Sequence, residues 1–172
     1  KANISEDKMF STMASIKKSF EYAKNCEDLI YFVEDDYIHK NEALTEMLFA
    51  YEKFSSILKS EIFILSTDYP YLYKNLNETS ILIGENTHWR NVKESLLTFM
   101  TSKKMIEKYF DKLVDMATVK SDPFEKNLHK IYQKEKCFSP IPSLSIHCTN
   151  VNSAYGLSPN INYSKLWEDN QN

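Results

Sequence analysis

The chain has 172 residues, of which 42% are hydrophobic and 13% aromatic, so it is long and apolar enough to bury the core of one ordinary domain. Its 24 acidic and 21 basic residues leave a formal charge of −3, and without a basic excess nothing points to a nucleic-acid partner. The chain contains only two glycines, which excludes the glycine-rich phosphate loops of P-loop and dinucleotide-binding proteins.

The cysteines indicate a compartment. Cys26, Cys137 and Cys148 are odd in number and form no C-x-x-C pair, so we expect free thiols in a reducing, cytoplasmic environment and leave a peripheral attachment to a membrane open. No apolar run reaches the roughly 18 residues that a membrane span needs, and no signal peptide is recognisable. Because the chain starts at Lys1 and not at methionine, we expect a processed product or a piece of a longer protein.

The first half of the chain alternates between helical and strand patterns. Residues 6–25 predict an amphipathic helix, because apolar residues recur there every three or four positions. The run LIYFV at 29–33 predicts a buried strand, and residues 41–58 predict a second helix. EIFILS at 61–66 predicts another buried strand, and the irregular stretch 67–80 follows it.

The second half adds more strands than helices. The expected elements are a strand at 81–84, one or two strands within 88–102, and helices at 102–117 and from 122. An extended segment follows at 137–147 and closes with a short strand that ends at His147. Strands that alternate with helices and then outnumber them predict an α/β domain with a mixed sheet. We expect this catalytic domain at 1–150 and an irregular tail, packed on the surface, at 151–172.

Three consecutive acids, Glu34, Asp35 and Asp36, follow the first predicted strand directly. Ligands of α/β sheets bind at the carboxyl ends of strands. Carboxylates this close together repel one another unless a cation cancels their charge, and oxygen ligands suit Mg²⁺ or Mn²⁺. Side chains alternate along a strand, so Glu34 and Asp36 would share one side and Asp35 would point to the other. The alternative is a solvated turn whose acid caps the next helix.

Four segments resemble motifs of GT-A glycosyltransferases, in the same order. DLIYFVEDDYIHKNEALTEML is similar to the Asp-x-Asp region, and THWRNVKESLLTFMTS is similar to the acceptor-side segment. SDPFEKNLHKIY resembles the segment in which an acid opens a helix beneath the acceptor, and SPIPSLSIH resembles the ending that supplies a metal-ligating histidine. The resemblance implies a Rossmann-type three-layer αβα sandwich with a mixed central sheet. It also implies transfer of a sugar from a nucleotide-diphosphate sugar to a hydroxyl of a glycan or glycoprotein.

This resemblance implies a metal site that joins distant parts of the chain. Asp36 would bind Mn²⁺ or Mg²⁺, and His147 would be the second protein ligand; the alternative for His147 is a partly buried histidine at a strand end. Glu34 and Asp35 would hold the ribose or sugar of the donor and would reach the metal through water. The ion would neutralise the charge on the leaving diphosphate.

Trp89 and Arg90 are candidates for substrate binding. An indole face packs well on a sugar ring, and a guanidinium pairs with phosphate in bidentate fashion. The alternative is a core tryptophan and a surface arginine.

The base that would take the proton of the acceptor hydroxyl in an inverting transfer is expected at Asp122, with Glu125 as the second candidate. Asp122 is equally well suited to cap a helix whose first turn holds Pro123. If neither acid serves as the base, the reaction would retain configuration.

The opening nucleotide-binding unit of GT-A domains has no counterpart here, so we expect a fragment whose other part completes the sheet. Two other classes stay open. A metal-dependent phosphoester hydrolase would normally need more metal ligands than this chain offers. A non-catalytic glycan-binding relative would keep the core and lose the metal, and the intact acidic triplet with His147 speaks against it.

Overall fold

A computed structural model describes residues 4–73, 79–118, 125–148 and 161–171. Its main feature is a mixed sheet of six strands, in which β3 and β7 are parallel neighbours and all other neighbours are antiparallel. In spatial order the strands are β1 (Leu29–Phe32), β6 (Phe99–Ser102), β3 (Phe63–Leu65), β7 (Cys137–Ile141), β5 (His88–Asn91) and β4 (Ile81–Ile83). A separate antiparallel ribbon consists of β2 (Tyr37–His39) and β8 (Ser145–His147).

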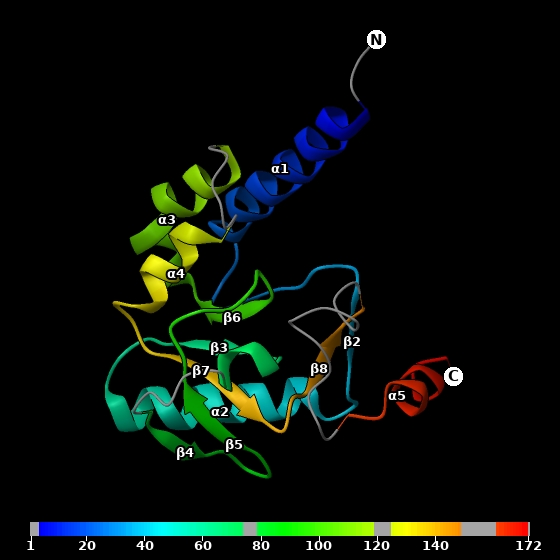
Figure 1. The fold of residues 1–172 in the computed structure, drawn as a ribbon. Helices are drawn as coiled ribbons and strands as arrows, with labels where there is room; N and C mark the ends of the chain where they lie inside the picture. Colours follow the sequence, from blue (N-terminus) through cyan, green and yellow to red (C-terminus); the bar gives the residue numbers. More distant parts are fainter. Residues whose placement is uncertain (1–3, 74–78, 119–124, 149–160, 172) are drawn as a thin grey trace.

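Helices cover both faces of the six-stranded sheet (Figure 1). One face carries α1 (Ile4–Ala23), α3 (Lys103–Thr118) and α4 (Lys126–Tyr132), and the other face carries α2 (Ala43–Leu58). The 3₁₀ helix η1 (Pro70–Tyr73) follows β3, and α5 (Tyr163–Asp169) lies beside β2. The predicted α/β class with a mixed central sheet is therefore confirmed.

The central strand β3 separates two hydrophobic cores. Phe63 and Leu65 belong to the core beneath α1, α3 and α4, and Ile62 and Ile64 belong to the core beneath α2. Successive side chains of a strand point to opposite faces, so a strand covered on both sides needs an unbroken apolar run. This explains why EIFILS could be recognised as a buried strand.

Two elements differ from the expectations. Tyr37–His39 forms a strand because β8, more than 100 residues later, supplies its partner, and three residues carry no pattern that reveals such pairing. The expected irregular tail is wrong for Tyr163–Asp169, which is helical. This helix buries only Leu166, so it has no apolar stripe, and its start is fixed by Asn162, whose side chain accepts a hydrogen bond from the Lys165 backbone N–H at 3.0 Å.

Candidate functional site

Acids and hydroxyls gather at one edge of the six-stranded sheet. The pairing makes β1, β3 and β7 run in the same direction, so their carboxyl ends share this edge. Glu34 follows β1, Asp68 follows β3, and Ser143 follows β7. Because ligands of open α/β sheets bind beyond the carboxyl ends of the strands, this edge is where a site is expected.

The register of the β2–β8 ribbon brings Asp36 to His147. Tyr37 pairs with His147, so the residue before β2 lies beside the end of β8. Nε2 of His147 is 2.7 Å from Oδ2 of Asp36, and the Cys148 backbone N–H donates to the Asp36 carbonyl oxygen at 2.8 Å. The two side chains that the resemblance names as metal ligands are thus in direct contact, although they are 111 positions apart.

Glu34 completes a group with these two residues. One ligand atom from each of Glu34, Asp36 and His147 lies within 4.8 Å of the other two, and we call these three residues the acidic cluster. Burial raises the pKa of Glu34 to about 7, and the charges of Asp36, Glu125 and Asp35 add to the rise. The acidic cluster therefore sits in a field of surplus negative charge.

The chemistry of the acidic cluster fits a divalent cation. Two carboxylates and an imidazole offer the oxygen and nitrogen ligands that Mg²⁺, Mn²⁺ or Zn²⁺ accept. Ligands of an octahedral Mg²⁺ are roughly 3 to 4.2 Å apart, and the three ligand atoms, all within 4.8 Å of one another, are near enough to approach one ion. Cations are drawn to such surplus negative charge, and they would keep Glu34 ionised at neutral pH.

Tyr37 packs on the imidazole of His147, and Tyr69 bonds Tyr37. The ring of Tyr37 stacks on His147 with centroids 4.6 Å apart and planes 12° apart. The hydroxyl of Tyr37 shares a hydrogen bond with the hydroxyl of Tyr69, and both tyrosines are buried. Metal-binding histidines depend on such neighbours for their orientation.

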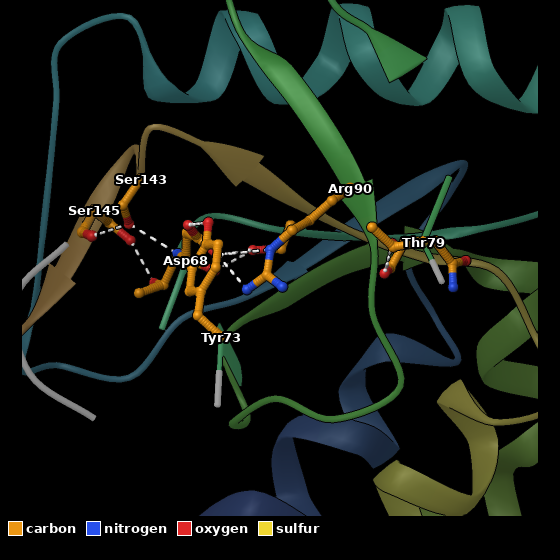
Figure 2. Close-up of polar contacts among 9 residues, drawn as sticks. Asp68, Tyr73, Thr79, Arg90, Ser143 and Ser145 are labelled. Atoms are coloured by element: carbon orange, nitrogen blue, oxygen red, sulfur yellow. Dashed lines mark hydrogen bonds and ion pairs between the residues drawn. The ribbon is translucent and has the colours of Figure 1, made fainter. Parts of the chain in front are cut away.

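A second group of polar residues surrounds Asp68 (Figure 2). Arg90 donates to Oδ1 of Asp68 from Nε at 3.1 Å and from Nη2 at 2.7 Å, and Ser139 donates to the same oxygen at 3.2 Å. Tyr73 donates to Oδ2, and its ring lies 4.0 Å from the guanidinium carbon of Arg90. These four residues form what we call the Asp68 cluster, in which the one negative charge has one positive partner.

Hydroxyl groups connect the Asp68 cluster to β8 (Figure 2). The backbone N–H of Asp68 donates to Oγ of Ser143 at 2.9 Å, and Ser143 donates to the Ser145 carbonyl oxygen at 2.7 Å. Ser145 lies two positions before His147 on the same strand. The Asp68 cluster thus supports the strand that carries the histidine of the acidic cluster.

The expected substrate-binding roles of Trp89 and Arg90 do not match their surroundings. Trp89 is 0% exposed and packs against Phe54 of α2, so its indole face is not available to a sugar. Gly84 lies close to this ring, and a Cβ there would fall 2.6 Å from the indole nitrogen. Arg90 is neither a surface residue nor open to a phosphate, because Asp68 and Tyr73 enclose its guanidinium.

The structure describes only one of the two candidate bases. Asp122 lies outside the described residues. Glu125 is the N-cap residue of α4, and its charge contributes to the raised pKa of Glu34. Asp35, the middle acid of the triplet, is exposed in the turn between β1 and β2.

The sequence analysis overlooked Asp68 and Tyr37. Asp68 follows the buried strand β3 as Glu34 follows β1, so the same pattern of an acid after an apolar run was available. The segment TDYPYLY, which contains Asp68, is otherwise dominated by tyrosines. Tyr37 had no comparable signal, because its importance depends on the register with His147.

A hollow of about 350 Å³ adjoins the acidic cluster between α1 and β1. Its lining includes Phe20 and Ile30 in addition to Glu34. Its size reaches the lower limit of small-molecule sites. A ligand bound by the acidic cluster therefore has apolar surface within reach.

Comparisons with protein-family models, with curated proteins and with solved structures find no match for this chain. Within the described residues, no helix combines the length and apolar character needed to cross a membrane.

Proposed function

We propose that the protein is a metal-dependent glycosyltransferase with a GT-A-like arrangement of its α/β layers. It would move a sugar from a nucleotide-diphosphate sugar to a hydroxyl group of a glycan or glycoprotein, with inversion. The observation that carries this proposal is the contact of 2.7 Å between Asp36 and His147, together with Glu34 in the same cluster. The resemblance of the sequence motifs supplies the reaction class.

In this proposal the acidic cluster holds Mn²⁺ or Mg²⁺. When bound, the ion supplies Lewis-acid neutralisation of the diphosphate that leaves the sugar. Asp36 and His147 fix its position, and Tyr37 keeps the imidazole ring oriented through their stacking contact. Asp35 is exposed beside the acidic cluster and is proposed to accept hydrogen bonds from the hydroxyl groups of the donor.

The proton of the acceptor hydroxyl needs a carboxylate. Asp122 remains a proposal that rests on the sequence motif alone. Glu125 is supported by its electrostatic effect on Glu34, which indicates that its carboxylate lies near the acidic cluster. Arg90 and Trp89 are not assigned to the substrate, because Asp68 and the core beneath α2 already occupy them.

Donor hydrolysis tests the proposal. The protein is incubated with a panel of nucleotide-diphosphate sugars and, separately, with p-nitrophenyl phosphate, each with Mn²⁺ or with EDTA. We expect slow release of nucleotide diphosphate from at least one donor, only with the metal, and no turnover of the simple ester. Turnover of the ester alone would instead identify a phosphoester hydrolase.

A substitution of Asp36 tests whether the activity depends on the acidic cluster. Asp36→Asn should abolish donor hydrolysis and leave the fold intact, because an amide is a poor ligand for a hard cation. Asp111→Asn is the matched control, since it removes one exposed carboxylate on α3, outside the acidic cluster. Full activity of Asp36→Asn would contradict the proposal.

A further inference from the structure

The helix α5 exposes a tryptophan above a hollow. Trp167 is 48% exposed, although its neighbour Leu166 is buried and anchors the helix. Tyr163 stacks on Trp167 with centroids 6.5 Å apart and planes 29° apart, which braces the indole in position. An aromatic face that is both braced and exposed is ready to contact a ligand.

The hollow beside Trp167 has a volume of about 300 Å³. We call it the α5 hollow; its lining residues are Tyr37, Ile38, His39, Trp167, Asn170 and Gln171. One wall is therefore the strand β2, and the other wall is the end of α5 and the two residues that follow it. The lining combines aromatic rings with amide groups and is small enough for a small molecule or a few linked sugar units.

Asn170 ties the two walls together. Its Nδ2 donates to the His39 carbonyl oxygen at 3.1 Å and to the Leu166 carbonyl oxygen at 2.9 Å. Both bonds use the NH₂ group, so the amide oxygen stays available to accept a hydrogen bond from a ligand hydroxyl. The exposed amide of Gln171 adds a further donor and acceptor.

We propose that the α5 hollow binds carbohydrate, with Trp167 stacking on a sugar ring and the amides of Asn170 and Gln171 bonding its hydroxyl groups. Sugars present both an apolar C–H face and a ring of hydroxyls, and the α5 hollow offers a partner for each. Under the proposed function, this is a subsite for the acceptor glycan. The role as acceptor subsite rests on that proposal, but the binding itself requires neither metal nor donor.

The position of the α5 hollow supports this role. Tyr37 lines the hollow and also stacks on His147 of the acidic cluster. The strand β2 has three residues and rises about 3.3 Å for each, so the hollow begins next to the acidic cluster and extends roughly 10 Å from Asp36. A glycan seated there would have units close enough to reach the transfer site.

Two other occupants fit less well. A stable protein partner usually covers about 800 Å² on each side, and six residues around a small hollow offer much less. An anionic membrane would be repelled, because α5 carries Lys165 against the two acids Glu168 and Asp169. A neutral, hydroxyl-rich ligand meets neither obstacle.

The test uses a glycan array with the full chain, in the absence of metal and nucleotide. We expect at least one class of oligosaccharide to bind, and Trp167→Ala to weaken that binding at least about tenfold. Phe49→Ala is the matched control, because Phe49 is an exposed aromatic residue on α2, outside the α5 hollow, and this variant should bind as the unchanged protein does. No binding to any glycan, or equal binding by Trp167→Ala, overturns the proposal.

Fluorescence locates the bound glycan. The chain has two tryptophans, and since Trp89 is fully buried, quenching by acrylamide reports on Trp167. The oligosaccharide selected on the array should protect Trp167 from acrylamide. If vesicles of phosphatidylcholine and phosphatidylserine protect it and the oligosaccharide does not, the surface contacts a membrane and the proposal is wrong.

A last comparison separates this proposal from the proposed function. Asp36→Asn should lose the metal-dependent activity and keep its binding to the array. Trp167→Ala should lose binding to the array and keep its affinity for Mn²⁺. An unchanged protein that binds glycan without any donor hydrolysis would contradict the proposed function alone.

Discussion

The Asp68 cluster and the acidic cluster lie at the same edge of the sheet, and they differ in whether their negative charges are neutralised. In the Asp68 cluster, one buried carboxylate meets a guanidinium and two hydroxyls, so every charge has a partner within the protein. In the acidic cluster, Glu34 and Asp36 share a single imidazole, and Asp35 and Glu125 add negative charge nearby. The comparison indicates that the Asp68 cluster is structural, whereas the acidic cluster has the surplus negative charge for which we propose a cation.

The largest effect on stability is expected at the Asp68 cluster. Arg90→Ala would leave the buried carboxylate of Asp68 without its cation, and the loss of one partner of a buried pair costs about 3–5 kcal/mol of unfolding free energy. Urea denaturation followed by circular dichroism measures this loss. The matched control is Lys108→Ala, which removes an exposed partner of Glu135 and should cost much less, because water screens this surface pair. If both variants lose the same unfolding free energy, the buried pair of Asp68 and Arg90 contributes no more to stability than an exposed pair.

The next effect concerns metal affinity. His147→Ala should weaken Mn²⁺ binding at least about tenfold, or roughly 1.4 kcal/mol, because one of three ligands is lost. Calorimetric titration of the protein with MnCl₂ measures it. His129→Ala is the control, since that histidine contacts the Ser95 carbonyl oxygen, outside the acidic cluster. An unchanged affinity of His147→Ala would show that this imidazole only supports the ribbon.

A third effect is a pH dependence of stability that Glu34 should produce. The pKa of Glu34 is raised from 4.5 to about 7 in the folded protein, so the folded state keeps its proton to a higher pH than the unfolded chain does. The resulting stabilisation is complete below about pH 4.5 and is lost as the pH rises through about 7.

Unfolding of the metal-free protein at different pH values tests whether stability falls as the pH rises. Between about pH 5 and pH 8, the unfolding free energy of the unchanged protein should fall relative to that of Glu34→Gln, which cannot titrate. Mn²⁺ should restore the stability at the upper end of this range, because a bound cation favours the ionised carboxylate. Parallel curves for the two proteins would show that Glu34 has no raised pKa.

The smallest effect is expected from Tyr37→Phe. This change keeps the ring that stacks on His147 and removes the hydroxyl that bonds Tyr69, so it should cost about 1 kcal/mol of stability. Tyr37→Leu also removes the stack and should additionally weaken Mn²⁺ binding. If both variants bind Mn²⁺ like the unchanged protein, Tyr37 has no part in orienting the imidazole.

Much of the fold could be predicted from local patterns. The strand β3 was recognisable because both of its faces are buried, and α2 and α3 were recognisable because apolar residues line one side of each. The short strand that was expected to end at His147 is confirmed as β8, whereas β2 was hidden, because three residues form a strand only when a distant partner is present. Pairing between distant strands depends on the whole chain, so it cannot be predicted from a short segment alone.

The candidate site was predictable to a similar degree. Asp36 and His147 were named because the motifs follow one another in a known order, and the sequence offered no measure of the distance between them. Trp89 shows the opposite limit: an aromatic residue in a strand suits a sugar or a core equally well, and the packing against α2 places it in the core. Arg90 and Asp68 are 22 positions apart and both contact Tyr73 of η1, an arrangement that no local pattern reveals.

The pairing register of β2 with β8 has a consequence for how the protein tolerates change. A strand that slips by one position turns all its side chains to the opposite face. One residue inserted between Asp36 and Tyr37 would therefore separate the Asp36 carboxylate from the His147 imidazole. Every residue of the acidic cluster would still be encoded, and the six-stranded sheet would be untouched. The length of this turn is therefore as strict a requirement as the identity of its acids.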